Sequence, residues 1–260
     1  MSSNKKTNEI KRTNNTSSKL SGFSNKKNDV KIVASIFIIS ISSISCQQID
    51  KDATPLSIVM LGDSQIKQIQ GGYSGIPYSW SQLLSIDRVY NQGYNGYTLE
   101  EIYKGKDQNS PLKNTTELYP SIVYLMAGTN ECLNNGWFEE STCSIAVLYL
   151  DSIYQRLNDK NIQMSFILPV PFTRSIDSII NEGFVLNDRI DIIRSYLQKY
   201  CLNHDIECID LRDDLCYVDP VQNKWFLDDN LSIDGIHFNL DGYRLLGKPV
   251  IKSIKKNLIK

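Results

Sequence analysis

Residues 57–64 read Ser-Ile-Val-Met-Leu-Gly-Asp-Ser, an apolar run of strand length that stops at a glycine, an acid and a serine. Continuous apolar runs of this kind are typical of parallel strands that are buried on both faces. In α/β proteins the chemistry lies at the carboxyl ends of such strands. Ser64, which ends the run on a tight glycine-containing turn, is therefore a candidate nucleophile. The alternative is an ordinary strand-to-helix turn in which Asp63 or Ser64 caps the helix.

A serine nucleophile needs a base that accepts its proton and an acid that orients the base. The chain has only two histidines, His204 and His237. Asp234 lies three residues before His237 on a glycine-containing loop, so their side chains can fold toward each other. His204 lies in a polar connection between a helix and a strand and is interpreted as structural. The sequence thus predicts Ser64, His237 and Asp234 as catalytic residues.

Four short blocks occur in order along the chain: Gly62-Asp63-Ser64, Gly96 in a glycine-rich loop, Gly128-Thr129-Asn130, and Asp234 with His237. With these blocks, the segment from Leu56 to the C-terminus resembles the SGNH (GDSL-type) hydrolase family. The resemblance implies that the four marker residues of the family are Ser64, Gly96, Asn130 and His237. It also implies an oxyanion hole formed by the backbone N–H groups of Ser64 and Gly96 and by the Asn130 side chain. Two positions depart from the family pattern, because Gln65 stands where Leu gives the family its name and Glu131 where Asp is commoner.

Strand-like and helix-like segments alternate along the rest of the chain. Further strands are predicted at residues 88–91, 121–127, 164–168 and 206–211, and helices at residues 78–84, 144–158, 184–202 and 240–260. Thr98 is predicted to cap another helix, with Glu100 and Glu101 in its first turn. Alternation of this kind implies a parallel sheet with right-handed crossovers and helices on both faces. The expected fold class is α/β, a three-layer α/β/α arrangement with a five-stranded, mainly parallel sheet, and the resemblance implies the flavodoxin-like fold of SGNH hydrolases.

The N-terminal part differs in composition from this domain, which is expected to span residues 56–260. Residues 1–31 are polar and carry eight Lys or Arg against two acids, which predicts a disordered basic tail. Residues 32–44 form an uncharged apolar run that is shorter than the roughly 20 residues of a comfortable bilayer span and suits a signal peptide. Small residues at Ser43 and Ser45 precede Cys46, which fits a signal-peptidase site or, more loosely, a lipoprotein box. An uncleaved anchor is the alternative, and residues 47–55 are interpreted as a tether.

In each of these versions the enzyme is exported, and it is secreted or anchored to the outer face of a membrane through its N-terminal segment. The net charge of −1 conceals a charge of +6 in residues 1–31, so the remainder is acidic, which argues against nucleic acid as a partner.

The six cysteines are scattered without a metal-ligand pattern, and no phosphate-binding loop is present, so no metal and no cofactor are predicted. Cys132 and Cys143 are expected to form a disulfide if the domain is exported, with two packed free thiols as the alternative. The chain is expected to be a monomer.

The predicted function is that of a serine esterase which hydrolyses carboxylic esters through an acyl-enzyme. Members of the resembled family include carbohydrate O-acetylesterases, lysophospholipases and acyltransferases. Export and aromatic residues in loops favour O-acetyl esters of a glycan; these aromatic residues are Tyr73, Tyr78, Trp80, Tyr94, Trp137 and Trp225. A lysophospholipase or lipase-type acyl hydrolase and an acyltransferase are alternatives. An alternative of another class is a non-catalytic glycan-binding module.

Overall fold

The computed structural model describes residues 56–67, 88–133, 138–177 and 185–258. All described residues belong to one compact unit, which lies within Lys51–Lys260. The predictions for the basic tail, the apolar run, the tether and the helix at residues 78–84 lie outside the described residues. Within the described residues, no helix is long and apolar enough to cross a membrane.

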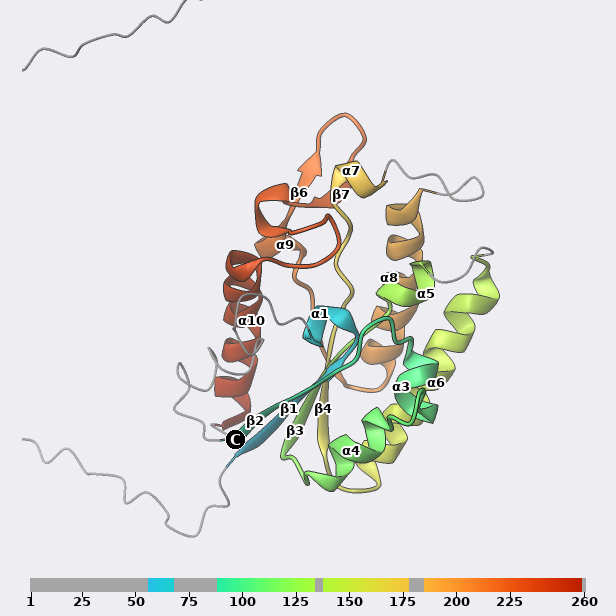
Figure 1. The fold of residues 1–260 in the computed structure, drawn as a ribbon, viewed down its shortest axis with the longest axis vertical. Coiled ribbons are helices and arrows are strands. Elements are labelled where there is room, and N and C mark those ends of the chain that lie inside the picture. Colours follow the sequence, from blue (N-terminus) through green and yellow to red (C-terminus); the bar gives the residue numbers. More distant parts are fainter. Residues whose placement is uncertain (1–55, 68–87, 134–137, 178–184, 259–260) are drawn as a thin grey trace, which may run out of the picture. The chain divides into compact units, whose positions relative to one another are not determined.

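A five-stranded sheet forms the centre of this unit (Figure 1), with the strand order β2-β1-β3-β4-β5. Its strands are β1 (Ser57–Gly62), β2 (Arg88–Gly93), β3 (Ile122–Met126), β4 (Gln163–Ile167) and β5 (Glu207–Ile209). Each neighbouring pair is parallel. The predicted α/β class is therefore confirmed, and the described sheet is parallel throughout. The fifth strand is shorter than the predicted range of 206–211.

Helices cover both faces of this sheet, as the three-layer prediction required. Figure 1 shows α10 (Leu240–Leu258) on one side, and α3 (Leu99–Lys104), α6 (Glu140–Asn158) and α8 (Leu186–Asn203) on the other. Side chains of β1 alternate between the two faces, as the pleat of a strand requires. Val59 and Leu61 belong to the apolar cluster under α6 and α8, whereas Ile58 and Met60 belong to the cluster under α10. Every residue of β1 is buried, which explains its uninterrupted apolar sequence.

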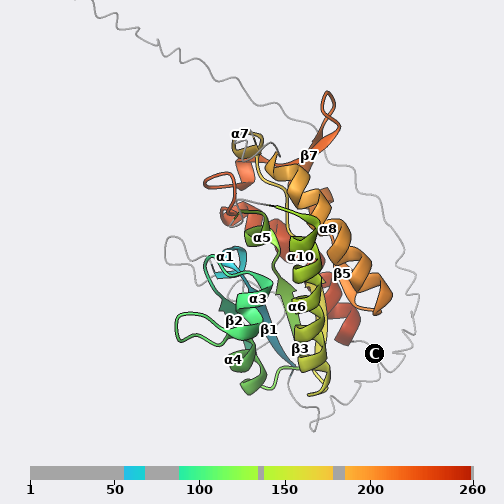
Figure 2. The same cartoon turned by 90° about the vertical axis from the view of Figure 1, so that its right-hand side faces the viewer.

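Several shorter elements complete the described chain. They are α1 (Ser64–Lys67), α4 (Pro111–Glu117), α5 (Thr129–Leu133), α7 (Arg174–Asp177), α9 (Arg212–Leu215), the 3₁₀ turn η1 (Asp229–Leu231) and the antiparallel hairpin of β6 (Cys216–Asp219) and β7 (Lys224–Leu227). The hairpin turn is fixed by the Asp219 carboxylate, which accepts hydrogen bonds from the backbone N–H groups of Val221 and Gln222 at 2.8 and 2.9 Å. Figures 1 and 2 show α7 and β7 beyond the end of the sheet at which α1 and α5 lie.

The predicted disulfide between Cys132 and Cys143 is wrong, because both residues are buried free thiols. Both side chains pack into the apolar cluster under α6 and α8. The Cys132 thiol donates a hydrogen bond to the Gly128 carbonyl, with 3.6 Å between the heavy atoms. Burial raises the pKa of the Cys132 thiol and raises that of Cys143 to about 11, so both are kept protonated. The alternative of two packed thiols therefore holds.

Candidate active site

Ser64 is the first residue of α1, directly after the buried end of β1. The turn that delivers it requires glycine, because a Cβ at Gly62 would lie 2.1 Å from the Met126 carbonyl oxygen. Asp63 follows, and one oxygen of its carboxyl group accepts the backbone N–H of Gln65 at 2.8 Å. Strand end and helix start are thus joined by one short turn. Ser64 itself is half-buried, so its hydroxyl lies at the edge of the core.

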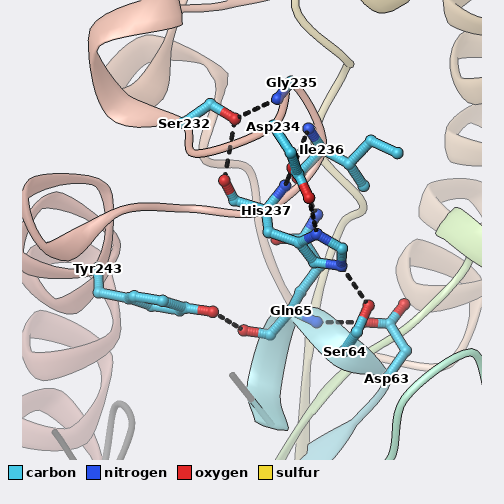
Figure 3. A network of polar contacts seen from close by, with 9 residues as sticks. All are labelled: Asp63, Ser64, Gln65, Ser232, Asp234, Gly235, Ile236, His237 and Tyr243. Carbon is cyan, nitrogen blue, oxygen red and sulfur yellow. Dashed lines mark hydrogen bonds and ion pairs between the residues drawn. The ribbon is translucent and has the colours of Figure 1, made fainter. Parts of the chain in front are cut away.

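His237 and Asp234 lie beside this serine, as the sequence predicted (Figure 3). Nε2 of His237 is 2.9 Å from Oγ of Ser64, and Nδ1 is 2.6 Å from Oδ2 of Asp234. A proton on Nδ1 is donated to the carboxylate, which leaves Nε2 to accept the serine hydroxyl. Partial burial opposes ionisation of Asp234. The N–H groups of His237 and Ile236 and the imidazole nevertheless donate to the Asp234 carboxylate, and together they lower its pKa.

The segment 232–239, called the histidine loop below, is ordered by its own backbone contacts. The Ser232 hydroxyl donates to the His237 carbonyl at 2.9 Å and accepts the Gly235 N–H at 2.8 Å (Figure 3). Gly235 has a φ of +88°, and the Thr173 N–H donates to its carbonyl at 3.0 Å. A Cβ at Gly235 would lie 2.3 Å from Cγ1 of Ile176. The glycine between Asp234 and His237 is therefore required both by backbone conformation and by the close approach of α7.

Gly96 and Asn130 follow the two strands that flank β1, so all three strand ends meet at one edge of the sheet. Gly96 adopts a φ of +72°, and among the described residues none except its chain neighbours lies within 4 Å of a Cβ built on it. The Asn130 side chain is buried, and its Nδ2 donates to the Tyr97 carbonyl at 3.0 Å. One of the two amide N–H bonds is thereby fixed, and the orientation of the amide is fixed with it.

Comparison with known proteins identifies the family of the chain. A profile of the GDSL-like Lipase/Acylhydrolase family matches residues 60–245, most of the chain and all of the described site. The chain belongs to this family. Membership makes it a serine-type carboxylic ester hydrolase, which confirms the enzyme class and the family that the sequence predicted. No curated protein matches the sequence significantly.

Solved structures with the same fold are distant in sequence. A GDSL-like lipase from Bacteroides thetaiotaomicron VPI-5482 is 16% identical, with a TM-score of 0.57, and the match covers 77% of this chain and 88% of the other. An acetyl xylan esterase is 17% identical, with a TM-score of 0.59, and the match covers 76% and 100%. A G-D-S-L family protein from Desulfitobacterium hafniense DCB-2 is 19% identical, with a TM-score of 0.58 and coverage of 75% and 98%. Identities this low show that the fold is shared.

Two buried carboxyl groups lie behind the GDSL-type site, and sequence reasoning missed both. Asp63 is fully buried, and burial together with the nearby Glu131 raises its pKa to about 8. Burial likewise raises the pKa of Glu131 to about 7, although one of its oxygens accepts the Leu99 N–H at 2.6 Å. The second oxygen of each group has no hydrogen-bond partner among the described residues. Their burial could have been suspected from the sequence, because Asp63 directly follows a buried strand and Glu131 directly follows Asn130.

Of the other residues that the sequence singled out, Tyr94 lies next to the end of β1, where its backbone N–H donates to the Gly62 carbonyl at 2.9 Å. His204 caps the end of α8, bonds the Tyr200 carbonyl through Nδ1 at 2.9 Å and stacks on the Tyr200 ring at 4.1 Å, in agreement with a structural role. Trp225 on β7 faces the Arg212 guanidinium at 5.3 Å. Tyr73, Tyr78, Trp80 and Trp137 lie outside the described residues. Within those residues, no cluster of three or more His, Cys, Asp or Glu side chains could hold a metal ion.

Proposed function

We propose that Ser64, His237 and Asp234 perform the ester hydrolysis of this GDSL-family chain through an acyl-enzyme. The supporting observation is the continuous hydrogen-bonded chain of 2.9 Å from Ser64 to His237 and 2.6 Å from His237 to Asp234. His237 takes the hydroxyl proton as Oγ of Ser64 attacks the ester carbonyl. The lowered pKa of Asp234 keeps this group ionised, so it holds the Nδ1–H tautomer and stabilises the imidazolium that forms.

The negative charge of the tetrahedral intermediate is assigned to the edge at which three strands end. The backbone N–H groups of Ser64 and Gly96 and the second N–H of the Asn130 amide would act as donors, and loss of one such donor typically costs about 3 kcal/mol. Collapse of the intermediate releases the alcohol, which receives its proton from His237. A water molecule then attacks the acyl carbonyl of Ser64 with His237 again as the base, and the carboxylic acid leaves.

For the substrate we propose O-acetyl esters of a glycan. An acetyl xylan esterase that is 17% identical to this chain has the same fold, which shows that the fold can support hydrolysis of such esters. Among the described residues, nothing outside the chain neighbours of Gly96 lies within 4 Å of a Cβ placed on it, and this space would accommodate the alcohol part of a bulky ester. Long-chain acyl hydrolysis, acyl transfer and glycan binding without turnover are the competing outcomes of the test.

The test compares p-nitrophenyl acetate with p-nitrophenyl decanoate and includes Ser64→Ala. The parent should prefer the acetate and release acetate from an acetylated xylan, and Ser64→Ala should lower kcat/KM by about a thousandfold or more. Ser144→Ala, which removes an exposed hydroxyl on α6, is the matched control and should leave the rate unchanged. Residual activity of Ser64→Ala within tenfold of the parent would reject the nucleophile, and preference for decanoate would reject the acetyl ester.

We further propose that the enzyme is exported and is secreted or attached to a membrane through its N-terminal segment. Support comes from the uncharged run at residues 32–44 behind a tail that carries eight basic residues. A chain that begins at Gln47 should remain in the soluble fraction and keep its activity, whereas the full chain should be processed or should sediment with membranes. Equal solubility of both, with an intact N-terminus on the full chain, would contradict export and anchoring together.

A further inference from the structure

Gln65 connects the turn that carries Ser64 with the histidine loop that carries His237. It follows Ser64 directly, its side chain is 1% exposed, and its Nε2 donates to the Ile236 carbonyl at 2.7 Å. Ile236 is the residue before His237, so this bond connects the neighbour of one reacting group with the neighbour of the other. A carbonyl oxygen can only accept, which fixes the amide with its nitrogen toward Ile236. The two ends of the contact are 171 positions apart in the sequence.

A second contact reaches Gln65 from the helix that follows the histidine loop. The Tyr243 hydroxyl of α10 donates to the Gln65 carbonyl at 2.8 Å, on the opposite side from the imidazole (Figure 3). The Tyr243 ring packs edge-on against Phe238, with 5.5 Å between centroids. Burial raises the pKa of Tyr243, so its hydroxyl stays a donor across the working range of pH. Gln65 therefore holds the chain at Ile236, just before His237, and again at Tyr243.

The histidine loop has particular need of such contacts. It belongs to no helix or strand, apart from one isolated bridge between Ser232 and Phe238. The side chains of His237 and Asp234 keep 21% and 47% of their surface in contact with solvent. Ser64, by contrast, is the first residue of α1 and directly follows the buried strand β1 and Asp63. A displacement of about 1 Å between reacting groups can cost a hundredfold in rate.

The second polar atom of the Gln65 side chain points to a role in function. Oε1 is buried and has no hydrogen-bond partner among the described residues. A buried unpaired amide oxygen destabilises a fold, so an apolar side chain of similar shape would serve stability equally well or better. The sequence nevertheless has glutamine at this position, where the family pattern has leucine. Its Nε2 bond to Ile236 is what an apolar residue would not provide.

We propose that Gln65 is a positioning residue, which holds the histidine loop so that Nε2 of His237 stays in line with the Ser64 hydroxyl. The inference rests on the proposed function of Ser64 and His237 and deepens it. Tyr243 supports the same contact by fixing the backbone of Gln65. The bond to Ile236 thus belongs to the catalytic geometry, although Gln65 touches no reacting atom.

Two substitutions at Gln65 separate positioning from simple packing. Gln65→Met keeps the length of the side chain but has no donor, and it should lower kcat about tenfold or more while KM stays within twofold and Tm is equal or higher. Gln65→Glu can donate to Ile236 only while its carboxyl group is protonated. Its kcat/KM relative to the parent should therefore fall as pH rises, whereas the corresponding ratio for Gln65→Met should stay flat.

Tyr243→Phe provides an independent variant, and Tyr124→Phe is its matched control. Each change removes one tyrosine hydroxyl. The Tyr243 hydroxyl of α10 donates to the Gln65 carbonyl, whereas the Tyr124 hydroxyl of β3 bonds Ser253 of α10 at 2.9 Å. Tyr243→Phe should lower kcat severalfold, and Tyr124→Phe should leave it unchanged. Equal kcat in the parent, Gln65→Met and Tyr243→Phe would overturn the proposal. So would a rise in KM alone, which would assign Gln65 to substrate contact.

Hydrogen exchange tests the same contact without any turnover. Amides of residues 232–239 should exchange faster in Gln65→Met than in the parent, while exchange in β1 and β3 stays the same. Absence of ester turnover in the parent would refute the proposed function, but faster exchange in Gln65→Met would still support the role of Gln65 in holding the loop. Unchanged exchange in Gln65→Met would refute the inference whatever the activity.

Discussion

Replacement of Asp63 by asparagine should remove a loss of stability that the parent undergoes as pH rises. Asp63 is fully buried, and its pKa is raised to about 8, first by burial and then by nearby Glu131. In the unfolded chain an aspartate titrates near 3.9. Between these two values the folded protein holds a proton that the unfolded chain has released, so the free energy of unfolding falls with rising pH. The fall ends above the folded pKa.

The size of the effect follows from the same two values. Each pH unit inside the window costs about 1.4 kcal/mol, so the parent should lose up to about 4 kcal/mol from this group between pH 5 and pH 8. Relaxation around the ionised carboxylate and entry of water would reduce the loss. An asparagine at this position would not titrate, and its side-chain oxygen would still accept the Gln65 N–H that Asp63 accepts at 2.8 Å. The free energy of unfolding of Asp63→Asn relative to that of the parent should therefore rise steadily from pH 5 to pH 8.

The assay is chemical unfolding of both proteins from about pH 5 to pH 9, with the denaturant slope as a check on two-state behaviour. Asp219→Asn is the matched control, and its difference in stability from the parent should stay constant from pH 5 to pH 9. Backbone N–H groups of Gln222 and Val221 lower the pKa of Asp219, so its contribution to stability is fully present above the unfolded pKa of about 3.9 and is lost only as pH falls below that value. Parallel stability curves for the parent and Asp63→Asn from pH 5 to pH 8 would refute the raised pKa.

Three further changes probe the site. Asp234→Asn should lower kcat/KM, because an amide cannot stabilise the imidazolium, and steady-state kinetics that match the parent would remove Asp234 from the mechanism. Gly235→Ala should lower Tm and kcat together and cost about 1–3 kcal/mol, since φ is +88° and Ile176 blocks the added Cβ; thermal melts check this. Glu131→Gln keeps the acceptor for the Leu99 N–H and should be more stable than the parent at pH 8, where the buried carboxylate is ionised; equal unfolding midpoints would contradict this.

The strand β1, which precedes Ser64, could be predicted because both of its faces are buried and its sequence is therefore continuously apolar. Val59 and Ile58 enter different apolar clusters, so neither face tolerates a polar residue, and the run ends where the chain leaves the core. The helices predicted at residues 144–158 and 184–202 correspond to α6 (Glu140–Asn158) and α8 (Leu186–Asn203). The hairpin of β6 and β7 shows no such pattern. In β6 the neighbouring residues Tyr217 and Val218 are both exposed, and in β7 the neighbouring residues Phe226 and Leu227 are both buried, so neither strand alternates in its burial.

The site was predictable to the extent that its chemistry is local. Asp234 and His237 are three residues apart, and one loop conformation brings both the backbone N–H and the imidazole to a single carboxylate. Contacts between distant segments were not predictable. The sequence around Gln65 does not indicate that its side chain bonds the Ile236 carbonyl. The sequence around Asp63 likewise does not indicate that its carboxyl group is fully buried. Such facts depend on how α1 packs against the histidine loop.

The strand order explains why the two halves of this site respond differently to substitution. Because β1 lies between β2 and β3, Ser64, Gly96 and Asn130 are carried by three hydrogen-bonded neighbours. The proposed nucleophile and oxyanion donors therefore share the rigidity of the sheet, and moving one of them requires disturbing the core. His237 comes from outside the sheet, on a loop fixed only by individual contacts such as the bond from Gln65. Substitutions of core residues that pack against the sheet should accordingly reduce stability before they change kcat. Substitutions of residues that bond the histidine loop, such as Gln65, should reduce kcat while the fold stays intact.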